Sequence, residues 1–304
     1  MSKIVGIIGL GLLGGSLAMA LKAYTDYEVV GYARRQEICD KALADGCVSQ
    51  AWTDVDQLIQ HSDIVVFALP PATNAKLFAE KASLFKPGMV VTDVSSAKAE
   101  FAEAVYAHIP EGVHFVSVHP MAGSEKGGYE EATKDLFKKM GWIVLDDPDQ
   151  AAYDAAIADE LADMGRAVGS RVERIPLTEH DKCVAAISHM PHTMAAVIAK
   201  VAGGGPQGEQ RMRMSAGGFR DSTRVAGGHP GMWQEILMGN RDNVLYWLEE
   251  VHKEVQIVKD IFAKQDHQAL ENYLAEAKSI RDKWPVLMGL EQGASSEDKC
   301  KEEK

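Results

Sequence analysis

Short apolar runs alternate with amphipathic stretches along the first half of the chain. Each run is rich in Val and Ile and short enough to form one buried strand. The runs predicted to be strands are Ile4–Leu10, Glu28–Tyr32, Ile64–Leu69, Met89–Val94, His114–Val118 and Trp142–Leu145. Apolar residues recur at helical spacing between them, as in Asp54–Gln60 and Ala97–His108. Strands that are apolar throughout and alternate with helices indicate an α/β fold with a doubly wound parallel sheet.

The second half of the chain has a helical pattern. A helix at Ala151–Val168 and a short strand at Arg171–Ile175 are expected to close the first domain. Beyond Pro176, Thr178 and Asp181 resemble an N-cap with its acidic partner, at the start of a helix reaching about Val201.

Two further helical segments follow. Apolar residues every three or four positions from Trp233 to Phe262 predict one long helix or two nearly collinear ones. A last helix is expected at Gln268–Lys283, ending before Pro285.

These patterns suggest two domains and a tail. We expect a dinucleotide-binding domain at 1–176, an all-helical domain at 177–290 and a disordered tail at 291–304. A helix of about thirty residues is about 45 Å long, which exceeds the width of a domain of this size. Part of its apolar stripe is therefore expected to pack against a second subunit, although packing within its own chain is the alternative.

Charge and cysteine content limit the classes of partner. The formal net charge of −12 over 304 residues argues against binding to nucleic acid or to an anionic membrane surface. The four cysteines have no C-x-x-C spacing, which is typical of reduced thiols in a cytoplasmic protein. The uncharged stretch from Ile4 to Leu21 could be a targeting or membrane segment, but its five glycines make a poor membrane helix.

A glycine-rich turn, Gly9-Leu10-Gly11-Leu12-Leu13-Gly14, connects the first predicted strand to the first helix. In this G-x-G-x-x-G pattern Gly9 permits the tight turn, Gly11 lets the backbone approach a pyrophosphate, and Gly14 lets the helix pack closely on the strand. The helix N-terminus, including Leu12 and Leu13, then offers free N–H groups to the phosphates. Ligands of such sheets bind beyond the carboxyl ends of the strands, where Leu69 and Pro70 are also expected to line the cofactor site.

The residues after the second predicted strand bear on the choice of cofactor. An acidic residue near position 33 would hold the ribose 2′-hydroxyl of NAD, but this chain has Ala33 followed by Arg34 and Arg35. Arginines there can pair with a 2′-phosphate, so the sequence favours NADP. The alternative is that both arginines belong to a solvated loop and the cofactor is NAD.

Two side chains at strand ends are candidates for chemistry. His119 follows a predicted strand and can accept a hydrogen bond or a proton from a hydroxyl that is being oxidised. Ser96 could supply a second hydrogen bond, although its position also suits a helix cap.

The helical half contains a second polar group of residues. His189 and His192 are three residues apart on one helix face, but no third ligand follows at a suitable spacing, so no metal site is expected. Arg224 ends a glycine-rich polar run and its guanidinium suits a carboxylate. A surface pair between Arg224 and Asp221 is the alternative.

Taken together, these motifs resemble those of the prephenate/arogenate dehydrogenases of tyrosine biosynthesis. The resemblance extends from about residue 3 to 285 and rests on Asp93–Lys98, His119–Gly128, Ser188–His192 and Gly217–Arg224, with Met232-Trp233 downstream. It implies a Rossmann-type domain followed by a helical dimerisation domain, hence a homodimer. It also implies an NAD(P)-linked oxidative decarboxylation of prephenate to 4-hydroxyphenylpyruvate, or of arogenate to tyrosine.

The resemblance also implies roles for individual residues. His119 matches the catalytic histidine that polarises the ring hydroxyl, and Ser96 matches the serine that orients it. Arg224 matches the arginine that grips a substrate carboxylate, with His192 as its helper. The other residues assigned to the substrate are Ser124, Glu125, Gly217 and Asp221.

Two other functions are compatible with the same architecture. A β-hydroxyacid dehydrogenase would use a lysine of the helical domain, and Lys200 is present, but without the surrounding residues expected for it. A non-catalytic NADP-binding sensor is the second alternative.

Overall fold

The computed structural model describes residues 2–123 and 127–288. The chain divides into two compact units, a larger one that ends at Trp247 and a smaller one that begins at Leu248. The predicted tail, 291–304, lies outside the described residues, and the predicted domain boundary at 176/177 stays a prediction.

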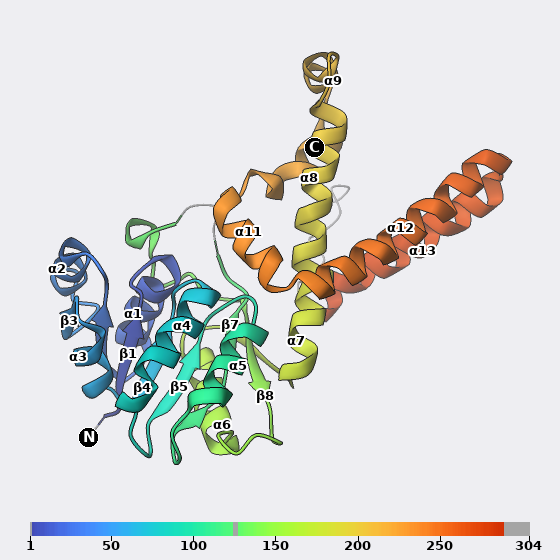
Figure 1. Cartoon of the computed structure of the whole chain (residues 1–304). Coiled ribbons are helices and arrows are strands. Elements are labelled where there is room, and N and C mark those ends of the chain that lie inside the picture. The colour runs from blue at the N-terminus through green and yellow to red at the C-terminus, as the bar shows by residue number, and fades with distance from the viewer. Residues whose placement is uncertain (1, 124–126, 289–304) are drawn as a thin grey trace, which may run out of the picture. The chain divides into compact units, whose positions relative to one another are not determined.

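Six parallel strands form the main sheet of the larger unit, in the order β3-β2-β1-β4-β5-β6 (Figure 1). This order reverses between β1 and β4, as in dinucleotide-binding folds, and the crevice at that point is where such sheets bind ligands. The strands are β1 (Ile4–Ile8), β2 (Glu28–Tyr32), β3 (Gln50–Trp52), β4 (Ile64–Phe67), β5 (Val90–Asp93) and β6 (His114–Phe115). The doubly wound α/β fold predicted from the apolar runs is confirmed.

Helices cover both faces of this sheet. One buried cluster joins the sheet to α1, α2 and α6, and another joins it to α3, α4 and α5, where Phe67, Phe78 and Phe101 meet ring against ring. The helices are α1 (Leu12–Tyr24), α2 (Gln36–Ala44), α3 (Val55–Gln60), α4 (Pro71–Lys81), α5 (Ala99–His108) and α6 (Ala155–Ala167). Short 3₁₀ turns occur at η1 (Ala82–Leu84) and η2 (Tyr129–Glu131).

A second, three-stranded sheet continues the chain. It consists of β7 (Val118–Pro120), β8 (Gly141–Asp146) and β9 (Arg171–Pro176), with β7 antiparallel and β9 parallel to β8. The predicted single strand His114–Val118 is therefore wrong, because the chain leaves the main sheet at Ser117. The Ser117 carbonyl accepts from the backbone of Leu145 and its hydroxyl donates to Asp93, so the following residues pair with β8 instead.

After β9 the larger unit is helical. Its elements are α7 (Leu177–Val184), a π-helical turn η3 (Ala185–His189), α8 (Met190–Gly203), α9 (Gly208–Arg213), α10 (Gly217–Thr223), the 3₁₀ turn η4 (Arg224–Gly227), α11 (Pro230–Gly239) and α12 (Arg241–Lys264), which continues into the smaller unit. Thr178 does not cap α7, which begins one residue earlier, directly after Pro176. The apolar stripe from Trp233 to Phe262 belongs to two helices, because the helical conformation is interrupted at Asn240.

The smaller unit contains the rest of α12 and α13 (His267–Leu287), and Figure 1 shows the two helices running side by side. Glu254 of α12 raises the pKa of Tyr273 in α13, so the two side chains lie close together, as expected for antiparallel neighbours. The predicted end of this helix before Pro285 is wrong. Proline in the last turn removes only one intrahelical hydrogen bond, and the Met288 N–H still bonds the Trp284 carbonyl.

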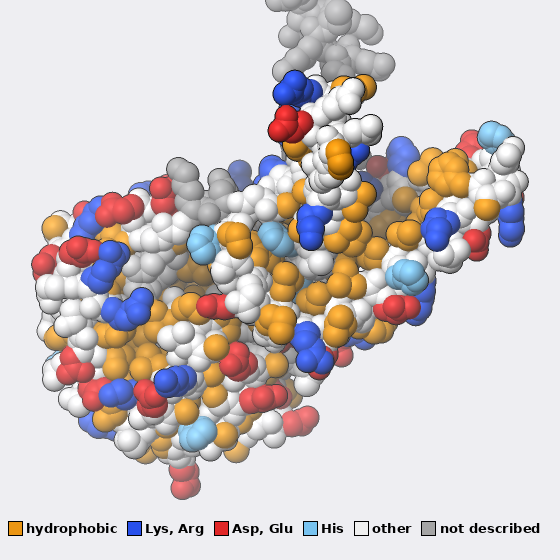
Figure 2. Space-filling view, turned by 45° about the horizontal axis from the view of Figure 1, so that its top comes forward, with side chains coloured by type: hydrophobic (Ala, Val, Ile, Leu, Met, Phe, Trp, Pro, Cys, Tyr) orange, Lys and Arg blue, Asp and Glu red, His pale blue; other side chains and the backbone are white. Residues whose placement is uncertain are grey.

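Large hydrophobic side chains are exposed on the helices of each unit, and Figure 2 shows hydrophobic side chains in orange at the surface. In the larger unit they include Ile187, Val197, Ile198 and Val201, and in the smaller unit Val255, Ile257, Phe262 and Ile280. Such exposure is typical of surfaces that a partner covers. Among the described residues, no helix is long and apolar enough to cross a membrane.

Candidate active site

The glycine turn has the geometry that the motif predicts. Gly9 has a positive φ of 106°, and a Cβ there would lie 2.6 Å from Leu69 Cδ2. A Cβ on Gly14 would lie 2.1 Å from the Gly9 carbonyl oxygen, so this position needs the close approach of helix and turn. A Cβ on Gly11 would meet nothing within 4 Å, so the space in front of Gly11 is open to a ligand.

Helix α1 presents an uncapped N-terminus to that space. Gly11 is its N-cap, no side chain caps it, and no acidic residue stands in its first turn. The N–H groups of Leu12, Leu13 and Gly14 therefore have no intrahelical acceptor. A thirteen-residue helix that starts in this way suits a diphosphate, so these residues fit a dinucleotide.

Buried Asn74 holds the neighbouring loop, a role that the sequence reasoning missed. Its amide accepts from the Leu69 N–H at 3.2 Å and donates to the Leu69 carbonyl at 2.9 Å and to Ser95 Oγ at 3.1 Å. Pro70 is the N-cap residue of α4. Asn74 thus fixes Leu69 beside Gly9 at the crevice.

The two arginines after β2 differ in their partners. Arg35 pairs with Glu37 at 2.6 Å. No carboxylate of the described residues pairs with Arg34. Ala33 is buried and its N–H donates to the Trp52 carbonyl, so no acidic side chain stands at this position.

His119 lies within β7, not after a strand as predicted, and it is part of a buried chain of hydrogen bonds. Its Nδ1 lies 2.9 Å from Nε2 of His180, whose Nδ1 lies 2.8 Å from Oδ1 of Asp181. The Asp181 carboxylate also accepts from the backbone N–H groups of Lys98 and Ala99 at 2.9–3.1 Å. Asp181 therefore caps α5 and not its own helix. No described residue hydrogen-bonds Nε2 of His119.

Burial and hydrogen bonding set the charge states of His119, His180 and Asp181. Burial lowers the pKa of His119 well below 6.5, and the nearby charge of Lys98 adds to the effect. Burial also lowers the pKa of His180. Burial raises the pKa of Asp181, but hydrogen bonds from His180 and from the Ala99 backbone outweigh it and hold that pKa below its usual value. At neutral pH both histidines are neutral and Asp181 is an anion.

A buried ion pair lies beneath His119. Lys98 Nζ donates to Asp93 Oδ2 at 2.8 Å and to the carbonyl of Val118, the residue before His119, at 2.6 Å. Asp93 also accepts from the Ser117 hydroxyl and the Ser95 N–H. Lys98 is 2% exposed, and burial lowers its pKa, although Asp93 counters the effect.

Ser96 does not cap a helix, because Asp181 caps α5 from another element. Its hydroxyl makes no hydrogen bond with a described residue. It is partly exposed in the loop after β5, so it remains available for a ligand.

His189 and His192 lie in the helical part of the larger unit, after β9. His192 stacks on Trp233, with ring centroids 3.5 Å apart and planes 13° apart. His189 is buried, and its Nδ1 lies 3.1 Å from the side-chain nitrogen of Asn240. Trp233 contacts both histidines, since its ring also meets His189 edge-on, with centroids 6.4 Å apart. Within the described residues, no group of three or more His, Cys, Asp or Glu side chains could hold a metal ion.

Arg224 is exposed in η4, a turn that packs on α8. Asp221 forms its ion pair with Arg220, at 2.8 Å, and not with Arg224 as in the alternative. Arg220, and to a smaller extent the charge of Arg224, lower the pKa of Asp221. No carboxylate of residues 2–123 and 127–288 pairs with Arg224. Gly217 is the first residue of α10, while Ser124 and Glu125 lie outside the described residues.

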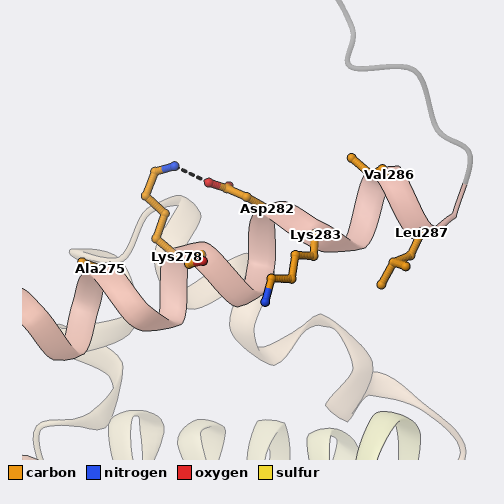
Figure 3. A pocket seen from close by; sticks show the side chains of 7 residues that line it. Ala275, Lys278, Asp282, Lys283, Val286 and Leu287 are labelled. Carbon is orange, nitrogen blue, oxygen red and sulfur yellow. Dashed lines mark hydrogen bonds and ion pairs between the residues drawn. The ribbon is translucent and has the colours of Figure 1, made fainter.

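Two surface hollows are lined by neither His119, Ser96 nor Arg224, although Asp181 and Asn240 line one of them. One, of about 520 Å³, runs along α13 and is lined by Lys278, paired with Asp282, and by Val286 and Leu287 (Figure 3). The other, of about 610 Å³, lies between α5, α7 and the start of α12. The residues that line the first hollow include no acid–base pair suited to a redox reaction. The second hollow is lined in part by Asp181 and Asn240.

The sheet order and the open glycine turn define the class of this protein as a dinucleotide-binding α/β protein. Its sequence matches the family model "Prephenate dehydrogenase, nucleotide-binding domain" over residues 17–173 and "Prephenate dehydrogenase, dimerization domain" over 176–276. The chain therefore belongs to the prephenate dehydrogenase family. It is an NAD(P)-dependent dehydrogenase whose reaction combines hydride transfer with decarboxylation.

Proteins of this family are also found among the individual relatives and solved structures that this chain resembles. Cyclohexadienyl dehydrogenase of Zymomonas mobilis is 30% identical over 92% of this chain and 95% of its own. Prephenate dehydrogenase of A. aeolicus, solved with hydroxyphenyl propionate and NAD⁺, is 26% identical with a TM-score of 0.83, covering 93% of this chain and 98% of its own. Synechocystis arogenate dehydrogenase is 26% identical with a TM-score of 0.82, covering 92% and 99%.

Proposed function

We propose that this enzyme oxidises prephenate or arogenate at the ring hydroxyl, with His119 as the acceptor of the hydroxyl proton. The observation that supports this proposal most strongly is the environment of His119. Its ring is buried and neutral at pH 7, Nδ1 is hydrogen-bonded to His180, and Nε2 has no partner among the described residues. A neutral imidazole with one uncommitted nitrogen is a suitable general base for a hydroxyl. Ser96, whose hydroxyl has no hydrogen-bond partner among the described residues, would orient the same oxygen.

The substrate chemistry explains why no stronger nucleophile is needed. The substrate ring is one hydride and one carboxylate away from aromaticity, so loss of CO₂ is steeply downhill once hydride has gone. The bound cofactor supplies the hydride acceptor. The protein must align the ring and accept the hydroxyl proton.

The remaining anionic part of the substrate is assigned to the helical side. Arg224 lacks a described carboxylate partner, which supports its pairing with a substrate carboxylate. His192, held against Trp233, is proposed to assist it. The further residues proposed for this pocket are Ser124, Glu125, Gly217 and Asp221.

The proposed cofactor is NADP, with NAD as the alternative. Arg34 has no described carboxylate partner and Arg35 is tied to Glu37, so Arg34 is the better candidate for a 2′-phosphate. Replacing Arg34 with Ala should weaken NADP binding and spare NAD, whereas Arg35→Ala is the matched control with a smaller effect. Equal effects of Arg34→Ala on both cofactors would contradict the NADP proposal.

The proposed partner is a second copy of this chain. The match to a dimerization domain and the exposed apolar side chains of α8, α12 and α13 support a homodimer. The helical domain at 177–290 is proposed to supply the contact. The cytoplasmic location stays a prediction.

A spectrophotometric assay that crosses prephenate and arogenate with NAD and NADP tests the proposal. We expect reduced cofactor to form with at least one substrate. His119→Asn should lower kcat strongly while leaving cofactor affinity nearly unchanged. Arg224→Ala should raise KM. The resulting fall in kcat/KM should correspond to a loss of about 2–4 kcal/mol in transition-state binding. Absence of activity with both substrates would overturn the proposal, and an unchanged KM would remove Arg224 from the site.

A further inference from the structure

Two adjacent residues of α7, His180 and Asp181, connect His119 to the N-terminus of α5. Both are buried, and no solvent-exposed group interrupts the hydrogen bonds from His119 Nδ1 through His180 to the Asp181 carboxylate. This connection goes beyond the roles assigned above, and it rests on the proposed function of His119.

The donors and acceptors along this chain can be assigned in only one way. An ionised carboxylate can only accept, so His180 Nδ1 must donate to Asp181. His180 is neutral, so its Nε2 has no proton and must accept from His119 Nδ1. His119 is then protonated at Nδ1 and has its lone pair at Nε2. We infer that His180 and Asp181 are positioning residues that hold His119 in the tautomer whose Nε2 accepts the substrate proton.

The same arrangement stabilises the charge that forms during the reaction. When hydride leaves the substrate carbon, the hydroxyl proton moves to Nε2 and His119 becomes an imidazolium. Its Nδ1–H remains bonded to His180, and the Asp181 anion lies beyond that ring. As the carbon–carbon bond to the carboxylate breaks, its electron pair makes the ring aromatic and CO₂ leaves. The proton then returns to the phenolic oxygen, so His119 ends neutral.

Asp181→Asn should reverse every donor in the chain without removing the helix cap. Oδ2 of Asp181 accepts from the N–H groups of both Lys98 and Ala99, at 3.1 and 3.0 Å, so the amide oxygen should take this place and keep the cap. The amide nitrogen then replaces Oδ1, which faces His180 Nδ1, and the 2.9 Å bond from the Lys98 N–H to Oδ1 is lost. That nitrogen donates, His180 becomes protonated at Nε2, and His119 must accept at Nδ1. Nε2 of His119 then carries a hydrogen and presents a donor to the substrate hydroxyl.

Two measurements test this inference. In ¹⁵N NMR of the histidine rings, His119 should be the Nδ1–H tautomer in the unchanged protein and the Nε2–H tautomer in Asp181→Asn. In steady-state kinetics kcat should fall by about 10²–10⁴-fold with little change in KM, since the same change in a serine-protease triad lowers kcat through the wrong tautomer. Asp154→Asn is the matched control, because Asp154 caps α6 with two hydrogen bonds and lies 3.8 Å from His114, but it contacts neither His119 nor His180.

The outcomes separate this inference from the proposed function. An unchanged His119 tautomer in Asp181→Asn, or a kcat loss no larger than that of Asp154→Asn, overturns the inference even if the enzyme oxidises prephenate. If the unchanged protein oxidises neither substrate, the proposed function fails, while the NMR result still decides whether the tautomer is held as inferred.

Discussion

Lys98→Met is the change that most directly tests how the site is built into the core. Methionine keeps most of the aliphatic length of lysine but removes the ammonium, which joins Asp93 at the end of β5 to the Val118 carbonyl in β7. The substitution leaves the Asp93 carboxylate fully buried, with the Ser117 hydroxyl and the Ser95 N–H as its remaining donors among the described residues.

The expected cost is large because the remaining charge has no counter-ion. Removing one partner of a buried ion pair typically costs about 3–5 kcal/mol, a large fraction of the roughly 5–15 kcal/mol that stabilises an ordinary domain. At about 2–4 °C per kcal/mol for a unit of this size, the thermal midpoint should fall by roughly 10 °C. Asp93→Asn added to Lys98→Met should recover most of this loss, since a neutral amide can keep its bond to Ser117 without a counter-ion.

Thermal and urea unfolding at one fixed protein concentration provide the assay, because dimer formation makes midpoints depend on concentration. Lys76→Met is the control: Lys76 forms an exposed i,i+4 pair with Glu80, and its loss should cost less than about 1 kcal/mol. A Lys98→Met protein as stable as the Lys76→Met protein would refute the reasoning. So would a double variant no more stable than Lys98→Met alone, because the loss would then not come from the unpaired carboxylate.

Two further predictions concern acid stability and the glycine turn. Burial lowers the pKa of His189 to about 4 from 6.5, so the unfolded chain binds more protons, and about 3 kcal/mol should be lost as the pH falls from about 6.5 through 4. The urea midpoint should fall over the same pH range, and it should fall less steeply in His189→Gln. An equal pH dependence of the midpoint in the two proteins would contradict a lowered pKa of His189. Gly11→Ala should keep the thermal midpoint and weaken cofactor binding, since its Cβ meets only open space. Gly14→Ala should lose stability, since its Cβ would overlap the Gly9 carbonyl, and an equally stable variant would contradict the close packing.

The fold was predictable where local pattern and long-range packing agree. The strands that became β1, β2, β4 and β5 are apolar throughout because helices cover both of their faces, so the sequence pattern is strong. β3 was missed because its three residues form a sheet edge with partly exposed side chains. The division of His114–Val118 between two sheets depends on the bonds of Ser117 to Asp93 and Leu145, which lie far along the chain and leave no local pattern.

The candidate site was predictable in its proposed reactive residues and not in the buried residues that hold them. His119 was identified as a histidine near a strand end, and Arg224 as a charge that apolar packing does not explain. Asp181 was interpreted as a partner of a local cap because acidic residues are common near helix starts. Its actual partners are the N–H groups of another helix, and sequence spacing gives no information about that contact.

The use of one carboxylate for two purposes couples the site to the fold. Asp181 caps α5 and accepts from His180, while its own backbone carbonyl accepts from Asn240, whose side chain also reaches His189. The hydrogen bonds of His119 and His180 therefore depend on the packing of α7 against α5 and β7, and Asn240, between α11 and α12, holds α7 through the Asp181 carbonyl. Because the catalytic tautomer of His119 depends on the same contacts, changes that loosen the packing of α7 should lower kcat before they unfold the protein. This order of effects would be absent if His119 were oriented only by its own strand.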